Sequence, residues 1–307
     1  MSRVECRVDI DAETGPRKPE MNLLEANMLK PAGLIRGHYE CRSFKETIPI
    51  LIELLAFEVV SEANGEKILK HPNTDWRLVM HEGGPDAPIK PMRNHYGVRV
   101  RTNEEVDRAT EYLEKAKDEL RIKIIKPRTN HNAYSVHFYE PGGNYWEIES
   151  YEHAVESGMG KTTSPHWTIP LTPEKYPGKG YVPQAFTHGT LENDDLETSE
   201  RFYREVLGLE VVKLWPSSCY IKHPTTPWYV VCIQALKQNR QPLTKYQRFT
   251  LSVGTPDEVC DAHRSFQTQR DHWKITNLED VQETSGEVSF LFSDLNRNWW
   301  EITSAER

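Results

Sequence analysis

The chain of 307 residues is long enough for two ordinary folded domains, and its apolar fraction of 37% is typical of a globular protein. A formal net charge of −8 without long lysine or arginine runs argues against a nucleic-acid partner, because such binding depends on neutralising backbone phosphates. No stretch approaches the roughly 18 apolar residues of a membrane-spanning helix, and the N-terminus lacks the apolar segment of a signal peptide. These features predict a soluble, cytoplasmic protein with no membrane partner.

The five cysteines are scattered along the chain, and none belongs to a Cys-x-x-Cys motif. They are Cys6, Cys41, Cys219, Cys232 and Cys260. This pattern indicates neither a disulfide framework nor a zinc knuckle. We therefore expect reduced, mostly buried thiols.

The N-terminal half contains two successive strand and helix patterns, which follow an N-terminal arm of residues 1–32. Residues 37–60 (GHYECRSFKETIPILIELLAFEVV) predict a strand, an amphipathic helix and a second strand. Residues 94–120 (NHYGVRVRTNEEVDRATEYLEKAKDEL) predict a strand and then a helix with an acidic first turn, as the helix dipole favours. Residues 138–150 (FYEPGGNYWEIES) predict two strands joined by a tight turn.

The C-terminal half repeats these patterns after a linker, residues 151–183, that is rich in Pro, Gly, Ser and Thr. Residues 187–212 (THGTLENDDLETSERFYREVLGLEVV) match the first pattern, and residues 247–271 (QRFTLSVGTPDEVCDAHRSFQTQRD) match the second. Residues 291–304 (LFSDLNRNWWEITS) match the closing strands and their turn. The chain is therefore a tandem duplication.

The repeats predict an α+β fold of four βαβββ modules, two in each half. We expect the modules to pair into two tandem domains, residues 33–150 and residues 184–307. Each domain would be an incomplete barrel of curved strands with its helices outside.

Three strands each offer one metal-ligand side chain on the face that points away from the aliphatic residues. Because successive side chains on a strand point to opposite faces, His38 points away from the residues on either side of it in the sequence, and the same holds for His95 and Glu147. Any one of these residues alone is more often structural. Together, at repeat-equivalent positions, two imidazoles and one carboxylate form the facial set that non-haem Fe(II) oxygenases use.

The paired units, the strand-opening histidines and the closing turn EPGGNYWE resemble the vicinal oxygen chelate superfamily. This superfamily includes glyoxalase I, bleomycin-resistance proteins and type I extradiol dioxygenases. The resemblance implies βαβββ units paired into a cup around a divalent metal, with ligands from the first strand of one unit and the first and last strands of the next. It assigns these places to His38, His95 and Glu147. In two-domain extradiol enzymes the working site lies in the C-terminal half, so this chain departs from that pattern.

The second half has a different residue at the middle ligand position. His188 and Glu301 repeat the outer ligands, but the counterpart of His95 is Arg248, beside Gln247. An arginine is effectively never deprotonated and cannot ligate a metal. We therefore expect the second domain to be metal-free, with its His and Glu as structural remnants.

The resemblance also implies a histidine and then a tyrosine shortly before the metal-binding glutamate. His131 and Tyr139 stand at similar places, the first as an acid or base and the second as a hydrogen-bond donor to the substrate oxygen. His137 alternates with Tyr139 on one strand face and is an alternative acid or base. The competing interpretation is an exposed turn for His131 and a packing role for Tyr139.

These residues predict an extradiol-type dioxygenase that binds Fe(II), or Mn(II) in its place, and cleaves a catechol-like or hydroquinone-like aromatic with dioxygen. One alternative is a glyoxalase-like isomerase or lyase with Zn(II), Ni(II) or Co(II), although such enzymes usually have an additional Glu ligand that has no clear candidate here. Another alternative is a non-catalytic small-molecule binding protein. The resemblance further implies a homodimer.

Overall fold

The computed structural model covers most of the predicted modules. The described residues are 2–4, 6, 28–63, 65–130, 133–152, 176, 178–235 and 243–305. Most of the predicted N-terminal arm and linker lies outside these ranges. Among the described residues, no helix combines the length and the apolar character needed to cross a membrane.

Four modules follow one another along the chain, and each begins with a strand that leads into a helix. Module one contains β2 (Gly33–Cys41), α1 (Phe44–Leu55), β3 (Glu58–Ala63), β4 (Glu66–Lys70) and β5 (Arg77–Glu82). Module two contains β6 (Tyr96–Arg99), α2 (Asn103–Leu120), β7 (Lys123–Asn130), β8 (Ala133–Tyr139) and β9 (Tyr145–Ser150). Module three contains β10 (Ala185–Asn193), α5 (Leu196–Arg201), its π-helical continuation (Phe202–Val206), β11 (Glu210–Trp215), β12 (Ser218–Lys222) and β13 (Tyr229–Gln234). Module four contains β14 (Arg248–Ser252), α6 (Pro256–Thr268), α7 (Arg270–Trp273), β15 (Asn277–Leu278), β16 (Gln282–Thr284), β17 (Glu287–Ser293) and β18 (Trp299–Thr303).

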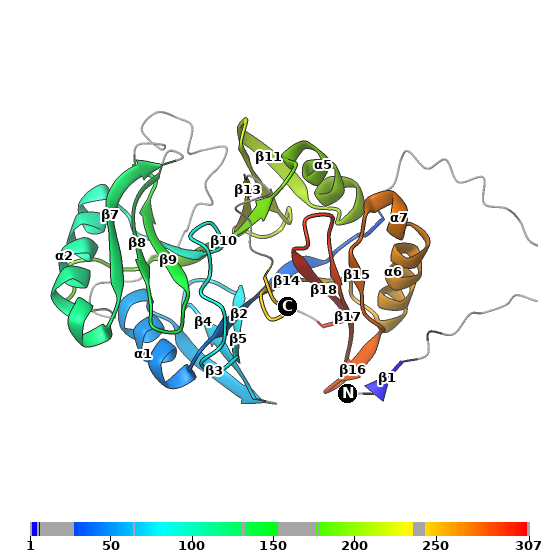
Figure 1. The fold of residues 1–307 in the computed structure, drawn as a ribbon, viewed down its shortest axis with the longest axis horizontal. Coiled ribbons are helices and arrows are strands. Elements are labelled where there is room, and N and C mark those ends of the chain that lie inside the picture. Colours follow the sequence, from blue (N-terminus) through cyan, green and yellow to red (C-terminus); the bar gives the residue numbers. More distant parts are fainter. Residues whose placement is uncertain are drawn as a thin grey trace, which may run out of the picture.

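The α+β fold of four paired modules is therefore confirmed. The second helices of the two halves begin as their sequences predict. The Thr102 hydroxyl accepts a hydrogen bond from a backbone N–H of α2, and Thr255 forms a capping box with Glu258 at the start of α6. Figure 1 shows the helices on the outer side of the strands.

The strands form two sheets, and each sheet combines one module from each half of the chain. One sheet runs β1-β16-β17-β18-β14-β2-β5-β4-β3, where β1 is Ser2–Arg3 and β15 pairs with β17 beside this path. The other runs β11-β12-β13-β10-β6-β9-β8-β7. Module one thus joins module four through β2 and β14, and module two joins module three through β6 and β10.

This partner choice corrects the expectation that modules pair within each half. Within its own module, each first strand leaves one edge unpaired. A tandem duplication therefore provides several strand edges of nearly the same pattern. Neighbours in sequence are neighbours in space only about two-thirds of the time. Periodicity along one strand therefore cannot identify the strand that joins it from another module.

One aromatic residue from each module meets at the centre of the molecule. Trp76, Tyr96, Phe186 and Phe249 come from modules one to four in turn, and all are buried. The ring centroid of Trp76 lies 4.5 Å from that of Phe186 and 6.0 Å from that of Phe249. Burial of such large rings contributes strongly to stability, so this cluster holds the two sheets together. The opposite faces of the first strands are left to line two cups.

The closing turn of module two is held by a buried carboxylate. Glu140 accepts hydrogen bonds from the backbone N–H groups of Gly142 and Asn144. Asp294 accepts equivalent bonds within the closing turn of module four. This geometry explains the recurring acid before each turn, and it fixes the start of the strand that carries Glu147.

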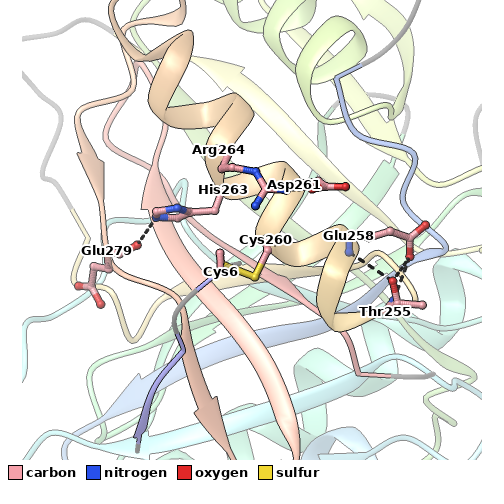
Figure 2. The surroundings of a disulfide bond; sticks show 8 residues. All are labelled: Cys6, Thr255, Glu258, Cys260, Asp261, His263, Arg264 and Glu279. Carbon is pink, nitrogen blue, oxygen red and sulfur yellow. Dashed lines mark hydrogen bonds and ion pairs between the residues drawn. A yellow bond between two sulfur atoms is a disulfide. The ribbon is translucent and has the colours of Figure 1, made fainter. Parts of the chain in front are cut away.

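The structure joins Cys6 to Cys260 of α6 in a disulfide bond, as Figure 2 shows. Their Cα atoms lie 5.5 Å apart, a separation typical of disulfides. The prediction of reduced thiols is therefore wrong for this pair, whereas Cys41, Cys219 and Cys232 are free and buried. The partners are 254 residues apart, and spacing alone cannot reveal such a pairing.

Thiol titration will check the disulfide directly. Denatured protein that has not been reduced is expected to expose three reactive thiols per chain, because two of the five cysteines are bonded. After reduction the count should rise to five. A count of five before reduction would contradict the bond, and a Cys6→Ser/Cys260→Ser variant should give three under both conditions.

Candidate metal centre

The cup between modules two and three brings three potential metal ligands together. His95, Glu147 and His188 each offer one ligand atom, and these atoms all lie within 4.8 Å of one another. The Nε2 atoms of both histidines lie 3.1 Å from Oε2 of Glu147. All three side chains are buried. This set of two imidazoles and one carboxylate matches the donor types predicted from the sequence.

The structure does not bring His38 to this cluster, which corrects the predicted ligand set. His38 lies in the other cup, where its Nε2 atom is 2.9 Å from Thr250 Oγ1 and 3.2 Å from Glu301 Oε2. His188, which the sequence assigned to a metal-free second domain, takes the place of His38 beside Glu147. The reason is the exchange of modules, because the neighbour of β6 is β10 and not β2.

A second layer of contacts orients both histidines. Nδ1 of His95 lies 2.8 Å from the backbone oxygen of Met92, so this nitrogen donates and leaves Nε2 as the free lone pair. Nδ1 of His188 lies 3.0 Å from Thr187 Oγ1 and 3.3 Å from a carboxylate oxygen of Glu149. Such partners fix the ring orientation of metal-binding histidines. Both imidazoles therefore present the nitrogen that faces Glu147.

The buried carboxylate Glu149 and its partner Arg99 were missed at the level of sequence. A nitrogen of the Arg99 guanidinium lies 2.7 Å from Oε1 of Glu149. Alternation along β9 gave one usable signal, since Glu149 shares a strand face with Glu147. The contact with His188 depends on a strand from the other half, so no local pattern could reveal it.

The charges in the cup favour a bound cation. Burial lowers the pKa of His95, which favours the neutral form that a metal requires. Burial acts to raise the pKa of Glu147, but the neighbouring histidines outweigh it and hold this pKa well below its usual range. Burial also opposes charge on His188, yet Glu149 and Glu147 raise its pKa to about 9. The cup thus stabilises positive charge at His188, where a divalent cation would displace the proton. The residues present fit a divalent metal.

Of the three predicted catalytic residues, the structure places one against the cluster. Nε2 of His137 lies 3.2 Å from Glu147 Oε1, and its buried Nδ1 atom has no hydrogen-bond partner among the described residues. Tyr139 instead packs on Tyr145 with ring centroids 4.6 Å apart, and it is not among the residues that line the cup. His131 lies outside the described residues.

The donors open into a cavity of about 600 Å³, a size that suits a small organic ligand. Its walls combine the metal donors with aromatic, aliphatic and polar groups. These further groups include His137, Tyr151, Tyr220, Val231, Ile233 and Gln234. The cavity therefore offers a flat substrate an apolar wall beside the metal donors.

The strand pairing places Val231 where a fourth ligand would stand. Val231 lies opposite Thr190, two residues beyond His188. Glu147 has the same offset from His95 within module two. Since valine has no donor atom, module three supplies one ligand where module two supplies two.

Comparisons with known proteins agree with this architecture. Residues 43–148 match the family model of the Glyoxalase/Bleomycin resistance protein/Dioxygenase superfamily. Glyoxalase I from Zea mays is similar in structure, with a TM-score of 0.62, 14% identity, and coverage of 88% of this chain and 92% of that chain. A dioxygenase candidate from Bacillus subtilis subsp. subtilis str. 168 has a TM-score of 0.59 and 13% identity, with 90% of this chain and 86% of that chain covered. At these identities the similarity establishes the fold alone. No curated protein sequence matches the chain.

Proposed function

We propose that the chain is a metal-dependent dioxygenase of the extradiol type, and the match of residues 43–148 to the Glyoxalase/Bleomycin resistance protein/Dioxygenase superfamily model supports this proposal. Its substrate is a catechol-like or hydroquinone-like aromatic, and its co-substrate is dioxygen. The metal is Fe(II), with Mn(II) as the common substitute. The ligands are His95, Glu147 and His188, which replaces the His38 of the sequence prediction.

The observation that carries this proposal is the three-donor set with Val231 at the fourth place. Two histidines and one carboxylate leave adjacent coordination positions open, as in non-haem Fe(II) oxygenases. When bound, the metal would bring the aromatic and dioxygen together and would stabilise the negative charge that develops on oxygen. A glyoxalase-like isomerase would instead complete the site with a second carboxylate, and Val231 cannot supply one.

The protein's own residues have distinct tasks around the substrate. Glu149 and Thr187 hold the His188 ring in the orientation that faces Glu147. His137 lines the cavity, and its Nε2 atom lies 3.2 Å from Glu147 Oε1, beside the place a substrate would occupy. A proton could then be held at this nitrogen beside the reacting oxygen. Tyr220, Val231 and Ile233 also line the cavity, and their apolar surface would limit the water beside a bound substrate.

Metal analysis coupled to oxygen uptake tests the proposed activity. Protein purified without oxygen is expected to contain iron at about one atom per chain, and to consume dioxygen when a catechol or hydroquinone is added. Ring opening should match the oxygen consumed. Zinc or nickel without oxygen uptake would contradict the dioxygenase and would favour the isomerase. If the protein contains no metal, and the wild type and Glu147→Gln bind aromatics equally well, the result would favour a non-catalytic binding protein.

The His137→Phe variant tests the role of the His137 imidazole. It should retain iron, because His137 is not one of the three converging donors. Turnover is expected to fall by about 100-fold, the lower end of what positioned proton transfer contributes. Steady-state oxygen uptake and iron content measure the two effects separately. Tyr134→Phe on the same strand is the matched control, because its hydroxyl bonds to Asp107 away from the cup. Wild-type turnover in His137→Phe would contradict the assigned role.

A further inference from the structure

The cup between modules one and four contains a second cavity, of about 570 Å³, that the proposed metal chemistry does not use. Strands β2 and β5 of module one line one side, and strands β14, β17 and β18 of module four line the other. The size of the cavity is sufficient for a small organic molecule.

An internal ion pair occupies the centre of this cup, at the place that corresponds to the metal donors of the other one. Nε of Arg248 lies 3.3 Å from Glu301 Oε2, and both side chains are buried. Burial acts to raise the pKa of Glu301, but Arg248 outweighs it and holds this pKa well below its usual range. The His38 ring forms hydrogen bonds with Thr250 and His81. A molecule in this cavity would therefore be held by side chains and not by a metal ion.

One arginine that lines the cavity differs from the other charged groups because it has no ion-pair partner among the described residues. Five carboxylates line it, and each has a basic partner. The pairs are Glu66 with His81, Glu279 with Lys245, Asp280 with Arg3, Glu287 with Arg36, and Glu301 with Arg248. Arg77 has no ion-pair partner within the part of the chain that the structure describes.

Within the described ranges, Arg77 not only lacks an ion-pair partner but also lies beside a second arginine. Arg77 lies directly opposite Arg36 in the β2 and β5 ladder, and both line the cavity. Like charges at opposite positions on neighbouring strands repel each other. Glu287 forms a two-point ion pair with Arg36, so its carboxylate is already engaged. An anion bound beside Arg77 would relieve this repulsion.

The remaining wall of the cavity is apolar and partly aromatic. It includes Ile68, Val79 and Leu291. The Tyr246 ring lies 5.0 Å from that of His81 and is 44% exposed, so it stands at the edge of the cavity. A guanidinium beside an apolar wall suits a carboxylate attached to an apolar body, because the planar guanidinium pairs with a carboxylate through two parallel hydrogen bonds.

We propose that this second cup is a binding site for a small carboxylic acid with an apolar body, with the carboxylate on Arg77 and the apolar part against Tyr246 and Leu291. The site binds without catalysis. It does not depend on the metal centre, which lies in the other sheet.

Calorimetric titration with benzoate, the probe for this site, tests the proposal on the full chain. Saturable binding of one benzoate per chain is expected, and benzamide, its neutral isostere, should bind at least about tenfold more weakly. Arg77→Gln should weaken benzoate binding at least about tenfold, because the charged partner is removed. Arg101→Gln is the matched control, since Arg101 is exposed and lies outside the cavity.

Two further arms separate this site from the metal centre and from general anion binding. His188→Ala should bind benzoate as the wild type does, whereas loss of binding there would place benzoate on the metal and overturn the proposal. Inorganic phosphate that competes as strongly as benzoate would overturn the requirement for an apolar body. If Arg77→Gln does not fold, Tyr246→Ala is expected to weaken benzoate binding severalfold. No saturable binding to the wild type, or equal affinity in the variants, would also overturn the proposal.

Discussion

Replacing His188 with alanine is expected to remove the metal from the protein and abolish its oxygen uptake. The variant loses one of three converging donors, and the two that remain both come from module two. Removal of an indirect partner of a metal ligand already costs about 10- to 100-fold in metal affinity, so the loss of a ligand should exceed about 100-fold. Equilibrium dialysis with Fe(II) or Mn(II), followed by metal analysis, measures the change.

His38→Ala is the matched control for this experiment, because it removes the repeat-equivalent histidine from the other cup. His38 contacts Thr250 and Glu301 and not the proposed ligands, so metal content should stay at the wild-type level. Circular dichroism checks that both variants are folded. Loss of metal in His38→Ala with retention in His188→Ala would reverse the module pairing and contradict the structure.

The Gly97→Ala variant is expected to lose metal although no ligand is changed. Gly97 and His188 are register partners on β6 and β10, and a Cβ atom on Gly97 would collide with the His188 ring. Tyr229 limits retreat of the ring on the opposite side, because the two rings stack with centroids 5.5 Å apart. We therefore expect His188 to turn away from Glu147, with a fall in metal affinity of about 100-fold. Overpacking should also lower the free energy of unfolding by about 1–3 kcal/mol.

Gly37→Ala separates these two effects. A Cβ atom on Gly37 would meet the Tyr96 hydroxyl at 2.7 Å, so this variant also overpacks the interior but does not touch the donors. It should lose stability and keep its metal. Chemical denaturation and metal analysis of both variants measure the two quantities side by side. Wild-type metal affinity in Gly97→Ala, or equal metal loss in both variants, would contradict the role assigned to Gly97.

Alternation and repetition predicted a large part of the site. Because side chains on a strand alternate between two faces, the cup-facing positions of His95 and Glu147 followed from their neighbours. The repeated turn and aromatic pair before Glu147 and Glu301 predicted two closing strands, and the structure shows that Glu140 and Asp294 hold these turns by hydrogen bonds. Such features depend on residues close together in the chain.

Contacts between distant segments were beyond this reasoning. Sequence reasoning expected His188 to be a structural remnant and His38 to be a ligand, and the structure exchanges their places. The bond between Cys6 and Cys260 likewise joins segments 254 residues apart. The residues that flank these positions indicate neither the ligand set nor the disulfide pairing.

Local patterns in the sequence were sufficient to predict the four modules, the faces of their strands and the types of donor that a cup would contain. Only the tertiary structure decided which modules meet, and therefore that His188 joins His95 and Glu147 while Arg248 neutralises Glu301 in the other cup. The physical reason is that strand and helix periodicity arises from neighbouring residues, whereas four similar strand edges can pair in several ways. The pairing depends on packing of all four modules at once, including the aromatic cluster to which each contributes a ring.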